Sequence, residues 1–174
     1  MFANSRYTAD DVERTLGFAR ERIVVAHPGI HERFRAEGPK TELGSPYLFT
    51  AASFEPRKNL RTLLEAFAQV RARRPELELV IAGAQGDTGT EGARTLGYVP
   101  DDELPALYRG AEAFVFPSLF EGFGIPVAEW LKTDLREPVL DELSPDRLRR
   151  QGLFAPDEVG RLLAEHLAGP PEGA

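Results

Sequence analysis

The chain has 174 residues, 42% of them hydrophobic, which is enough for one folded domain, or slightly more, around a closed core. Its net charge is −7 and its basic residues are scattered, which argues against the basic surface typical of nucleic-acid-binding proteins. The chain contains no cysteine, so it has neither disulfides nor thiolate chemistry, and it has no apolar run near the roughly 20 residues that a membrane span needs. We therefore predict a cytoplasmic protein with neither a membrane span nor a nucleic-acid partner.

The start of the chain predicts a short helix followed by a strand. The helix is expected to begin with Thr8 as its N-cap, because acidic residues follow, and to end at Gly17. A strand is expected over residues 22–26. His27 and His31 flank the turn after it, but no third ligand stands at a spacing typical of a metal site, so no metal site is predicted.

Residues 46–83 predict a β-α-β unit. Strands are expected over residues 46–53 and 77–83, and the helix between them should begin after Asn59 as its N-cap and end before Pro75. Its apolar residues recur at the spacing of one helix face, and they are Leu60, Leu63, Leu64, Phe67 and Val70. No Gly-x-Gly-x-x-Gly motif joins the first strand to this helix, which disfavours a dinucleotide-binding enzyme.

The turn before this helix contains a candidate anion site. Arg57 and Lys58 precede the start of the helix, where side-chain cations and the positive end of the helix dipole come together. An Arg-Lys pair in a turn is also often simply solvated. The residues alone leave both interpretations open.

The next segment predicts a loop, a short strand, a helix and a buried strand. Glycine-rich residues 84–92 predict the loop, residues 95–99 the short strand, and Asp101 the opening of the helix. Residues 113–116 are four apolar residues in a row, which predicts a buried parallel strand because no polar face is left for solvent. From the residues alone, Tyr98 can be interpreted as a half-buried packing aromatic.

The last of these strands runs into a glycine-bracketed turn between two acids. Glu121 stands at the carboxyl end of the strand, and Gly122 and Gly124 allow a sharp turn and the close approach of a ligand. A proline then suits the first turn of a helix that contains Glu129. The turn is therefore expected to bring both carboxylates to one edge of a parallel sheet, where open α/β folds bind their ligands.

Residues 117–127, Pro-Ser-Leu-Phe-Glu-Gly-Phe-Gly-Ile-Pro-Val, resemble the donor-binding signature of retaining GT-B glycosyltransferases of the sucrose synthase and mannosyltransferase type (family 4, glycosyl transferases group 1). The resemblance covers residues 1–129, and the family's order is kept by Lys58, Gly97-Tyr98-Val99, Glu121 and Glu129. It implies an α/β fold, a Rossmann-like parallel sheet flanked by helices that forms half of a GT-B fold. It also implies a UDP-, GDP- or ADP-sugar as donor substrate, with no cofactor.

The resemblance implies a role for each site residue. Glu121 is expected to be catalytic, beside the transferred sugar, and Glu129 to accept hydrogen bonds from the ribose hydroxyls. The residues expected to contact the donor are Arg57 and Lys58 on the diphosphate, Tyr98 and Val99 at the base, and Gly122, Phe123, Gly124 and Glu129. Many members carry Gly-Arg where this chain has Ala52-Ser53, so one of the usual two phosphate cations is missing unless Arg57 substitutes for it.

After Glu129 the sequence departs from this family. Residues 122–168 resemble the carboxyl-terminal tail of glutamine-dependent asparagine synthetases, which share the Gly-Phe-Gly-x-Pro string. The Ser-Gly-Gly-x-Asp-Ser pyrophosphate loop of that family is absent, so its chemistry is not expected here. We therefore predict three parts, which are a linker-like helix and strand over residues 1–34, a nucleotide-sugar-binding domain over residues 35–130 and a helical tail over residues 131–174.

The sequence leaves three functions open. The first is the donor-binding half of a retaining hexosyltransferase, truncated because its acceptor-binding domain is absent. That domain would have to come from a separate N-terminal chain, and its acceptor is unknown. Transfer by this chain alone is expected to be weak or nil. The second is a non-catalytic fragment or chimera of a glycosyltransferase with an asparagine synthetase tail. The third is a glycosidase that uses Glu121 and Glu129, which is disfavoured because a helix-borne Glu129 beside a base pocket is poorly placed across a cleft.

Overall fold

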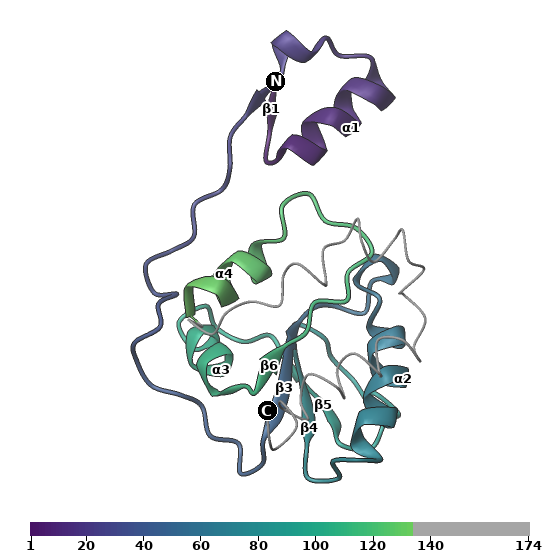
Figure 1. The fold of residues 1–174 in the computed structure, drawn as a ribbon, viewed down its shortest axis with the longest axis vertical. Coiled ribbons are helices and arrows are strands. Elements are labelled where there is room, and N and C mark those ends of the chain that lie inside the picture. The colour runs from purple at the N-terminus through teal and green to yellow at the C-terminus, as the bar shows by residue number, and fades with distance from the viewer. Residues whose placement is uncertain (134–174) are drawn as a thin grey trace, which may run out of the picture.

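The computed structural model describes residues 1–133. Residues 134–174, which make up most of the helical tail expected over residues 131–174, lie outside the described part. A four-stranded parallel sheet forms the centre of the fold, with the strands in the order β5-β4-β3-β6. They are β3 (Tyr47–Ala51), β4 (Glu78–Ala82), β5 (Ala93–Gly97) and β6 (Ala113–Phe114). Helix α2 (Leu60–Arg71) covers one face of the sheet, and α3 (Leu104–Gly110) and α4 (Ile125–Thr133) cover the other (Figure 1). The expected α/β fold, a parallel sheet flanked by helices, is confirmed.

Each face of the sheet has its own core, because alternate residues of a strand point to opposite sides. Leu48 of β3 and Leu79 of β4 pack against α2, whose buried apolar side chains are Leu60, Leu63, Leu64, Ala66, Phe67 and Val70. Phe49 of β3 points the other way, into a cluster with Tyr108 of α3 and Trp130 of α4. The apolar stripe expected on the helix after residue 59 is therefore confirmed.

Strand boundaries differ from the prediction at both edges of the sheet. β5 lies two residues earlier than expected, since Gly97 adopts a φ of 66° and takes the chain out of the strand before Tyr98. β6 contains two residues instead of the four expected over 113–116, and like β5 it is an edge strand of the sheet within the described residues. Its residues are only half-buried, so the prediction of a fully buried strand is wrong there.

Helix starts differ from the prediction in how they are capped. Asn59 precedes α2 as expected, but its φ is 54°, and its side chain accepts a hydrogen bond from the Thr62 hydroxyl (2.8 Å) rather than from a backbone amide. Helix α1 (Arg6–Leu16) begins before Thr8, because the Ser5 hydroxyl is the N-cap and accepts from the Thr8 amide at 3.0 Å. Helix α3 begins after Asp101, because a turn closed by the Pro100 carbonyl precedes it.

The amino-terminal part forms a small unit that stands apart from the sheet, above the loop that leads into α4 (Figure 1). It consists of β1 (Phe2–Ala3), α1, the 3₁₀ turn η1 (Arg20–Arg22) and β2 (Val24–Val25), with β1 and β2 parallel. Its core is small and contains Ala3, Ala9 and Ile23. The expected helix end at Gly17 is confirmed by a φ of 66°, whereas β1 was not predicted and β2 is shorter than the strand expected over residues 22–26.

Two segments that follow strands meet at the carboxyl edge of the sheet. One follows β3 and contains the 3₁₀ turn η2 (Pro56–Lys58); the other follows β6 and leads to α4. They are joined by a hydrogen bond of 2.8 Å from the Leu119 amide to the Arg57 carbonyl. Within residues 1–133, no helix has the length and apolar character needed to cross a bilayer.

Candidate functional site

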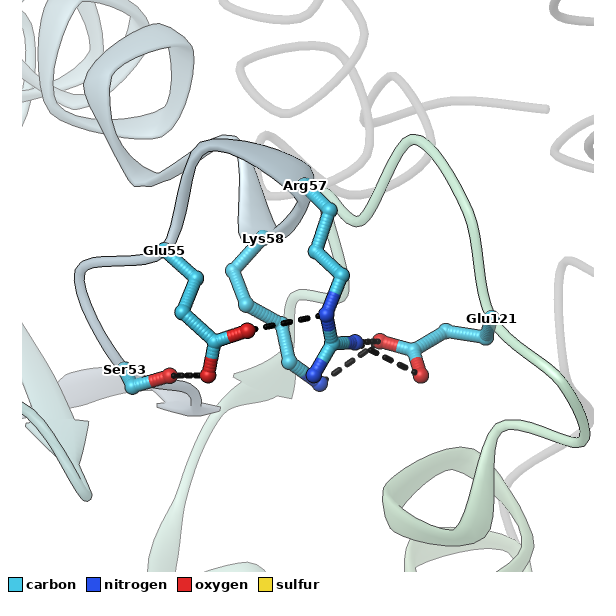
Figure 2. Close-up of polar contacts among 5 residues, drawn as sticks. All are labelled: Ser53, Glu55, Arg57, Lys58 and Glu121. Carbon is cyan, nitrogen blue, oxygen red and sulfur yellow. Dashed lines mark hydrogen bonds and ion pairs between the residues drawn. The ribbon is translucent and has the colours of Figure 1, made fainter.

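Two cations and one carboxylate meet where these segments touch. The Lys58 Nζ lies 2.6 Å from Glu121 Oε1, and the Arg57 Nη1 lies 3.2 Å from each of the Glu121 oxygens (Figure 2). The side chains of Lys58 and Glu121 are only 12% and 20% exposed. Because water screens such a pair less than an exposed one, the attraction between the two charges is stronger than in an ordinary surface salt bridge.

The local backbone explains why Lys58 points toward Glu121. Pro56 opens the 3₁₀ turn with its fixed φ, and the Lys58 amide donates to the Glu55 carbonyl at 2.9 Å. The left-handed Asn59 then ends the turn and starts α2. The Lys58 ammonium also lies 5.7 Å from the centre of the Phe116 ring, within the range of a cation–π contact. The interpretation of Lys58 as a simply solvated cation is therefore wrong.

Arg57, Lys58 and Glu121 form a charge cluster, and Glu55 also belongs to it. The sequence did not reveal this role of Glu55. Its Oε2 accepts from Arg57 Nε at 2.9 Å, and its Oε1 accepts from the Ser53 hydroxyl at 2.7 Å (Figure 2). The Ser53 hydroxyl, and after it the Arg57 guanidinium, hold the pKa of Glu55 below its ordinary value. The only signal in the sequence is the position of Glu55 between a hydroxyl and a cation, each two residues away.

Glu129 has different partners from Glu121. It lies on α4, and its Oε2 accepts a hydrogen bond of 3.2 Å from the hydroxyl of Tyr108 on α3. Burial raises the pKa of Glu129, the Tyr108 hydroxyl opposes this rise, and the charge of Asp101 adds to it. Burial, and then the Glu129 charge, also raises the pKa of Tyr108. The cations Arg57 and Lys58 contact Glu121, and Tyr108 contacts Glu129.

The glycine turn lies against the amino-terminal unit. A Cβ placed on Gly122 would lie 2.8 Å from Asn4 Nδ2, and the Thr8 hydroxyl donates to the Gly122 carbonyl at 3.2 Å. Another part of the chain therefore lies close to Gly122, through the side chains of Asn4 and Thr8. Phe123 lies beside the ring of His27, with 5.6 Å between ring centres. Gly124 has the positive φ, 82°, that the expected sharp turn requires.

The two residues expected at the nucleotide base lie in the turn between β5 and α3. The Tyr98 side chain is 78% exposed, so its alternative interpretation as a half-buried packing aromatic is wrong. Val99 is partly buried and packs against the cluster that contains Tyr108. A hydrogen bond of 2.7 Å from the Gly83 amide to the Gly97 carbonyl holds the start of this turn in place.

Two other kinds of site are less well supported by the described residues. Among them, no group of three or more histidine, cysteine, aspartate or glutamate side chains is arranged to hold a metal ion. A hollow of about 370 Å³ lies along α2, away from Glu121, and is lined by Phe54, Arg61, Leu64, Glu65, Ala68, Thr88 and Thr90. Its two charged lining residues, Arg61 and Glu65, are already paired with each other at 2.9 Å. The charge cluster at the sheet edge is therefore the stronger candidate.

Curated relatives of the chain are glycosyltransferases. The chain is 33% identical over 150 residues to the O-antigen chain mannosyltransferase B of Escherichia coli, an alignment that covers 72% of this chain and 39% of that protein. It is 31% identical over 159 residues to the D-inositol 3-phosphate glycosyltransferase of Streptomyces avermitilis, with 74% and 34% covered. The chain thus spans less than two fifths of the length of these two relatives.

Solved structures share the fold at low sequence identity. The structure of WaaG, a glycosyltransferase involved in lipopolysaccharide biosynthesis, matches with a TM-score of 0.75 at 16% identity, over 98% of this chain and 54% of that one. The pneumococcal O-GlcNAc transferase GtfA, solved in complex with UDP and GlcNAc, matches with a TM-score of 0.63 at 15% identity, over 95% of this chain and 38% of that one. These likenesses show the fold alone.

The family match covers the sheet and the charge cluster together. It extends over residues 32–135, from before β3 to beyond Glu129, and includes every residue expected to contact a donor. The parallel sheet flanked by helices agrees with the GT-B fold of the similar structures. The chain belongs to the family of glycosyl transferases group 1.

Proposed function

We propose that this chain binds the diphosphate of a nucleotide-sugar donor for retaining glycosyl transfer, with Lys58 and Arg57 as the phosphate-binding cations. The observation that carries the proposal is the convergence of both cations on one anionic group, Glu121, at 2.6 and 3.2 Å. A carboxylate and a phosphate are recognised by the same donors. The site also lies at the carboxyl edge of a parallel sheet and at the start of α2, where backbone geometry favours an anion.

In this proposal the two glutamates have separate roles. Glu121 turns from the cations toward the transferred sugar when a diphosphate takes its place, and acts as the catalytic residue. Lys58 and Arg57 then offset the charge that develops on the leaving diphosphate, which is electrostatic stabilisation and calls for no metal or other cofactor. Glu129 accepts hydrogen bonds from the ribose hydroxyls, because a carboxylate offers about four acceptor positions and Tyr108 uses one of them.

The remaining expected contacts are part of the same proposal. Tyr98 and Val99 would meet the nucleotide base, and the 78% exposure of Tyr98 leaves its ring open to a planar ligand. Gly122, Phe123 and Gly124 would border the donor.

Transfer is proposed to need a second, acceptor-binding domain. The chain spans 39% and 34% of two curated relatives, so most of the length of those proteins has no counterpart in it. That domain would come from a longer polypeptide or from a separate chain. On its own, the chain is proposed to bind a donor with weak transfer or none.

The donor sugar is proposed to be a hexose. Several relatives carry names of mannosyl transfer, among them the O-antigen chain mannosyltransferase B and the serotype-specific mannosyltransferase WbdA of Escherichia coli. A nucleotide-linked mannose is therefore the first donor to test, with UDP, GDP and ADP as the alternative nucleotides.

Calorimetry with UDP, GDP, ADP and their sugars tests the proposal. We expect Lys58→Ala to weaken binding of the best nucleotide diphosphate by about tenfold or more, the loss typical of a hydrogen bond to a charged group. Glu129→Ala should weaken binding only where the ligand carries a ribose, leaving inorganic pyrophosphate unaffected. Lys40→Ala removes an exposed lysine elsewhere and is the matched control. A folded wild-type protein that binds none of these ligands would show that the proposal is wrong.

A further inference from the structure

Two carboxylates contact the Arg57 guanidinium at different atoms. Glu55 accepts from Nε at 2.9 Å, whereas the Glu121 oxygens accept from Nη1 at 3.2 Å (Figure 2). The guanidinium is planar, and its N–H groups point in fixed directions. A partner that holds Nε therefore also sets the direction in which Nη1 points.

Glu55 is itself held in place by a neighbour in the turn. The Ser53 hydroxyl donates to Glu55 Oε1 at 2.7 Å, while Oε2 takes the bond from Arg57. Ser53, Glu55 and Arg57 alternate along five residues, so the row forms within one turn and needs no distant part of the chain. Both bonds hold the pKa of Glu55 below its ordinary value, because each of them favours the ionised carboxylate.

Arg57 needs such a partner more than Lys58 does. The Lys58 side chain is 12% exposed and lies against the Phe116 ring, so packing restricts it. The Arg57 side chain is 44% exposed. A long, exposed side chain loses much rotamer freedom when it binds a ligand, and a contact that orders it beforehand reduces that loss.

We propose that Glu55 is a positioning residue that, held by Ser53, fixes the Arg57 guanidinium so that Nη1 faces the anion-binding end of the site. This role rests on the proposed binding of a donor diphosphate. Glu121 is the contact of Arg57 that a phosphate replaces, and Glu55 is the contact that stays.

The sign of one effect separates this role from simple electrostatics. A carboxylate beside a phosphate site repels the ligand, so its removal by itself should strengthen binding. A positioning carboxylate has the opposite effect, because its removal leaves the cation disordered. Glu55→Ala therefore gives a weaker complex only if orientation outweighs charge.

The experiment measures UDP, GDP and ADP affinity by calorimetry for Glu55→Ala, Arg57→Ala and the double variant. We expect Glu55→Ala to weaken binding roughly three- to tenfold, and the double variant to bind no more weakly than Arg57→Ala alone. Glu55→Gln keeps one oxygen that can accept from Arg57, and it should restore part of the loss. Glu65→Ala is the matched control, because it removes the same charge from an Arg61 Nε contact of the same 2.9 Å length, and it should leave affinity unchanged.

Different outcomes overturn the two proposals. If Arg57→Ala weakens binding but Glu55→Ala binds as well as wild type or better, the positioning role is wrong and the diphosphate site stands. If Lys58→Ala and Arg57→Ala both leave affinity unchanged, or if wild type binds none of the nucleotides, the diphosphate site is wrong and the positioning role falls with it.

A second measurement needs no ligand. The Nε–H signal of Arg57 in nuclear magnetic resonance spectra should exchange slowly with water in the wild-type protein and lose this protection in Glu55→Ala. Equal protection in both proteins would overturn the positioning role. The thermal midpoint of Glu55→Ala should stay close to that of wild type, because the Glu55 side chain is 53% exposed.

Discussion

The two faces of the central sheet bury different kinds of side chain. The face toward α2 is mainly aliphatic, with Leu48, Leu63, Leu79 and Ile81 around Phe67. The opposite face is mainly aromatic, and its largest members are Phe34, Tyr47, Phe49, Tyr108, Phe114 and Trp130. The aliphatic face contributes through burial alone. The aromatic face also contributes hydroxyl groups, and one of them, on Tyr108, reaches Glu129, the proposed ribose-binding residue.

The aromatic face thus connects the core to the site. The Tyr47 hydroxyl donates to the Leu107 carbonyl at 2.9 Å, and the fully buried Tyr108 ring packs edge-on against Phe49 with 5.1 Å between centres. These contacts fix α3 against the sheet, and the Tyr108 hydroxyl in turn fixes Glu129 on α4. Substitutions on the aliphatic face should therefore change stability alone, whereas those on the aromatic face should also change the surroundings of Glu129.

The largest expected effect is on the aliphatic face. Phe67→Ala should lower the free energy of unfolding by about 3–5 kcal/mol, because it removes a fully buried ring and leaves a cavity. Urea denaturation measures the loss. Phe54→Ala is the control, since that ring is 48% exposed, and it should cost less than about 1 kcal/mol. Equal losses for both variants would contradict the assignment of Phe67 to the core.

The next effect is on the aromatic face. Tyr108→Phe keeps the ring and removes only the hydroxyl, which should lower the free energy of unfolding by about 1–3 kcal/mol because Glu129 loses a partner at a half-buried position. Thermal or urea denaturation checks it. Tyr7→Phe makes the same change at a ring that is 47% exposed and should have almost no effect. An unchanged stability for Tyr108→Phe would show that the Tyr108 hydroxyl does not connect the aromatic face to Glu129.

The fold could be predicted from the sequence because its signals are local. The apolar runs that became β3 and β4, and the apolar stripe of α2, follow from the burial of both sheet faces. Boundaries were less accurate where one residue decides them. The left-handed Gly97 ends β5 early, and the Ser5 hydroxyl starts α1 before Thr8.

The site could be predicted only in part. The family resemblance implied that Arg57, Lys58 and Glu121 would serve one donor, and the structure brings these three side chains together. It did not reveal the contact of Tyr108 with Glu129, which depends on how α3 packs against α4. Gly122 was predicted from turn geometry and ligand approach, whereas in the structure Asn4, more than a hundred residues earlier, lies against it.

The smallest expected effect is the pH dependence that Glu129 adds to stability. Burial raises its folded pKa above the ordinary value of 4.5, so the folded chain holds this proton more tightly than the unfolded chain does. Ionisation of Glu129 therefore lowers stability, and this loss is absent below pH 4.5 and develops as pH rises through the folded pKa.

In urea denaturation over this pH range, Glu129→Gln should remove the loss. Tyr108→Phe should enlarge it, because the lost hydroxyl was lowering the pKa of Glu129. Parallel pH profiles for wild type and both variants would mean that Glu129 is as well solvated as an exposed glutamate, and that the aromatic face has no influence on the site.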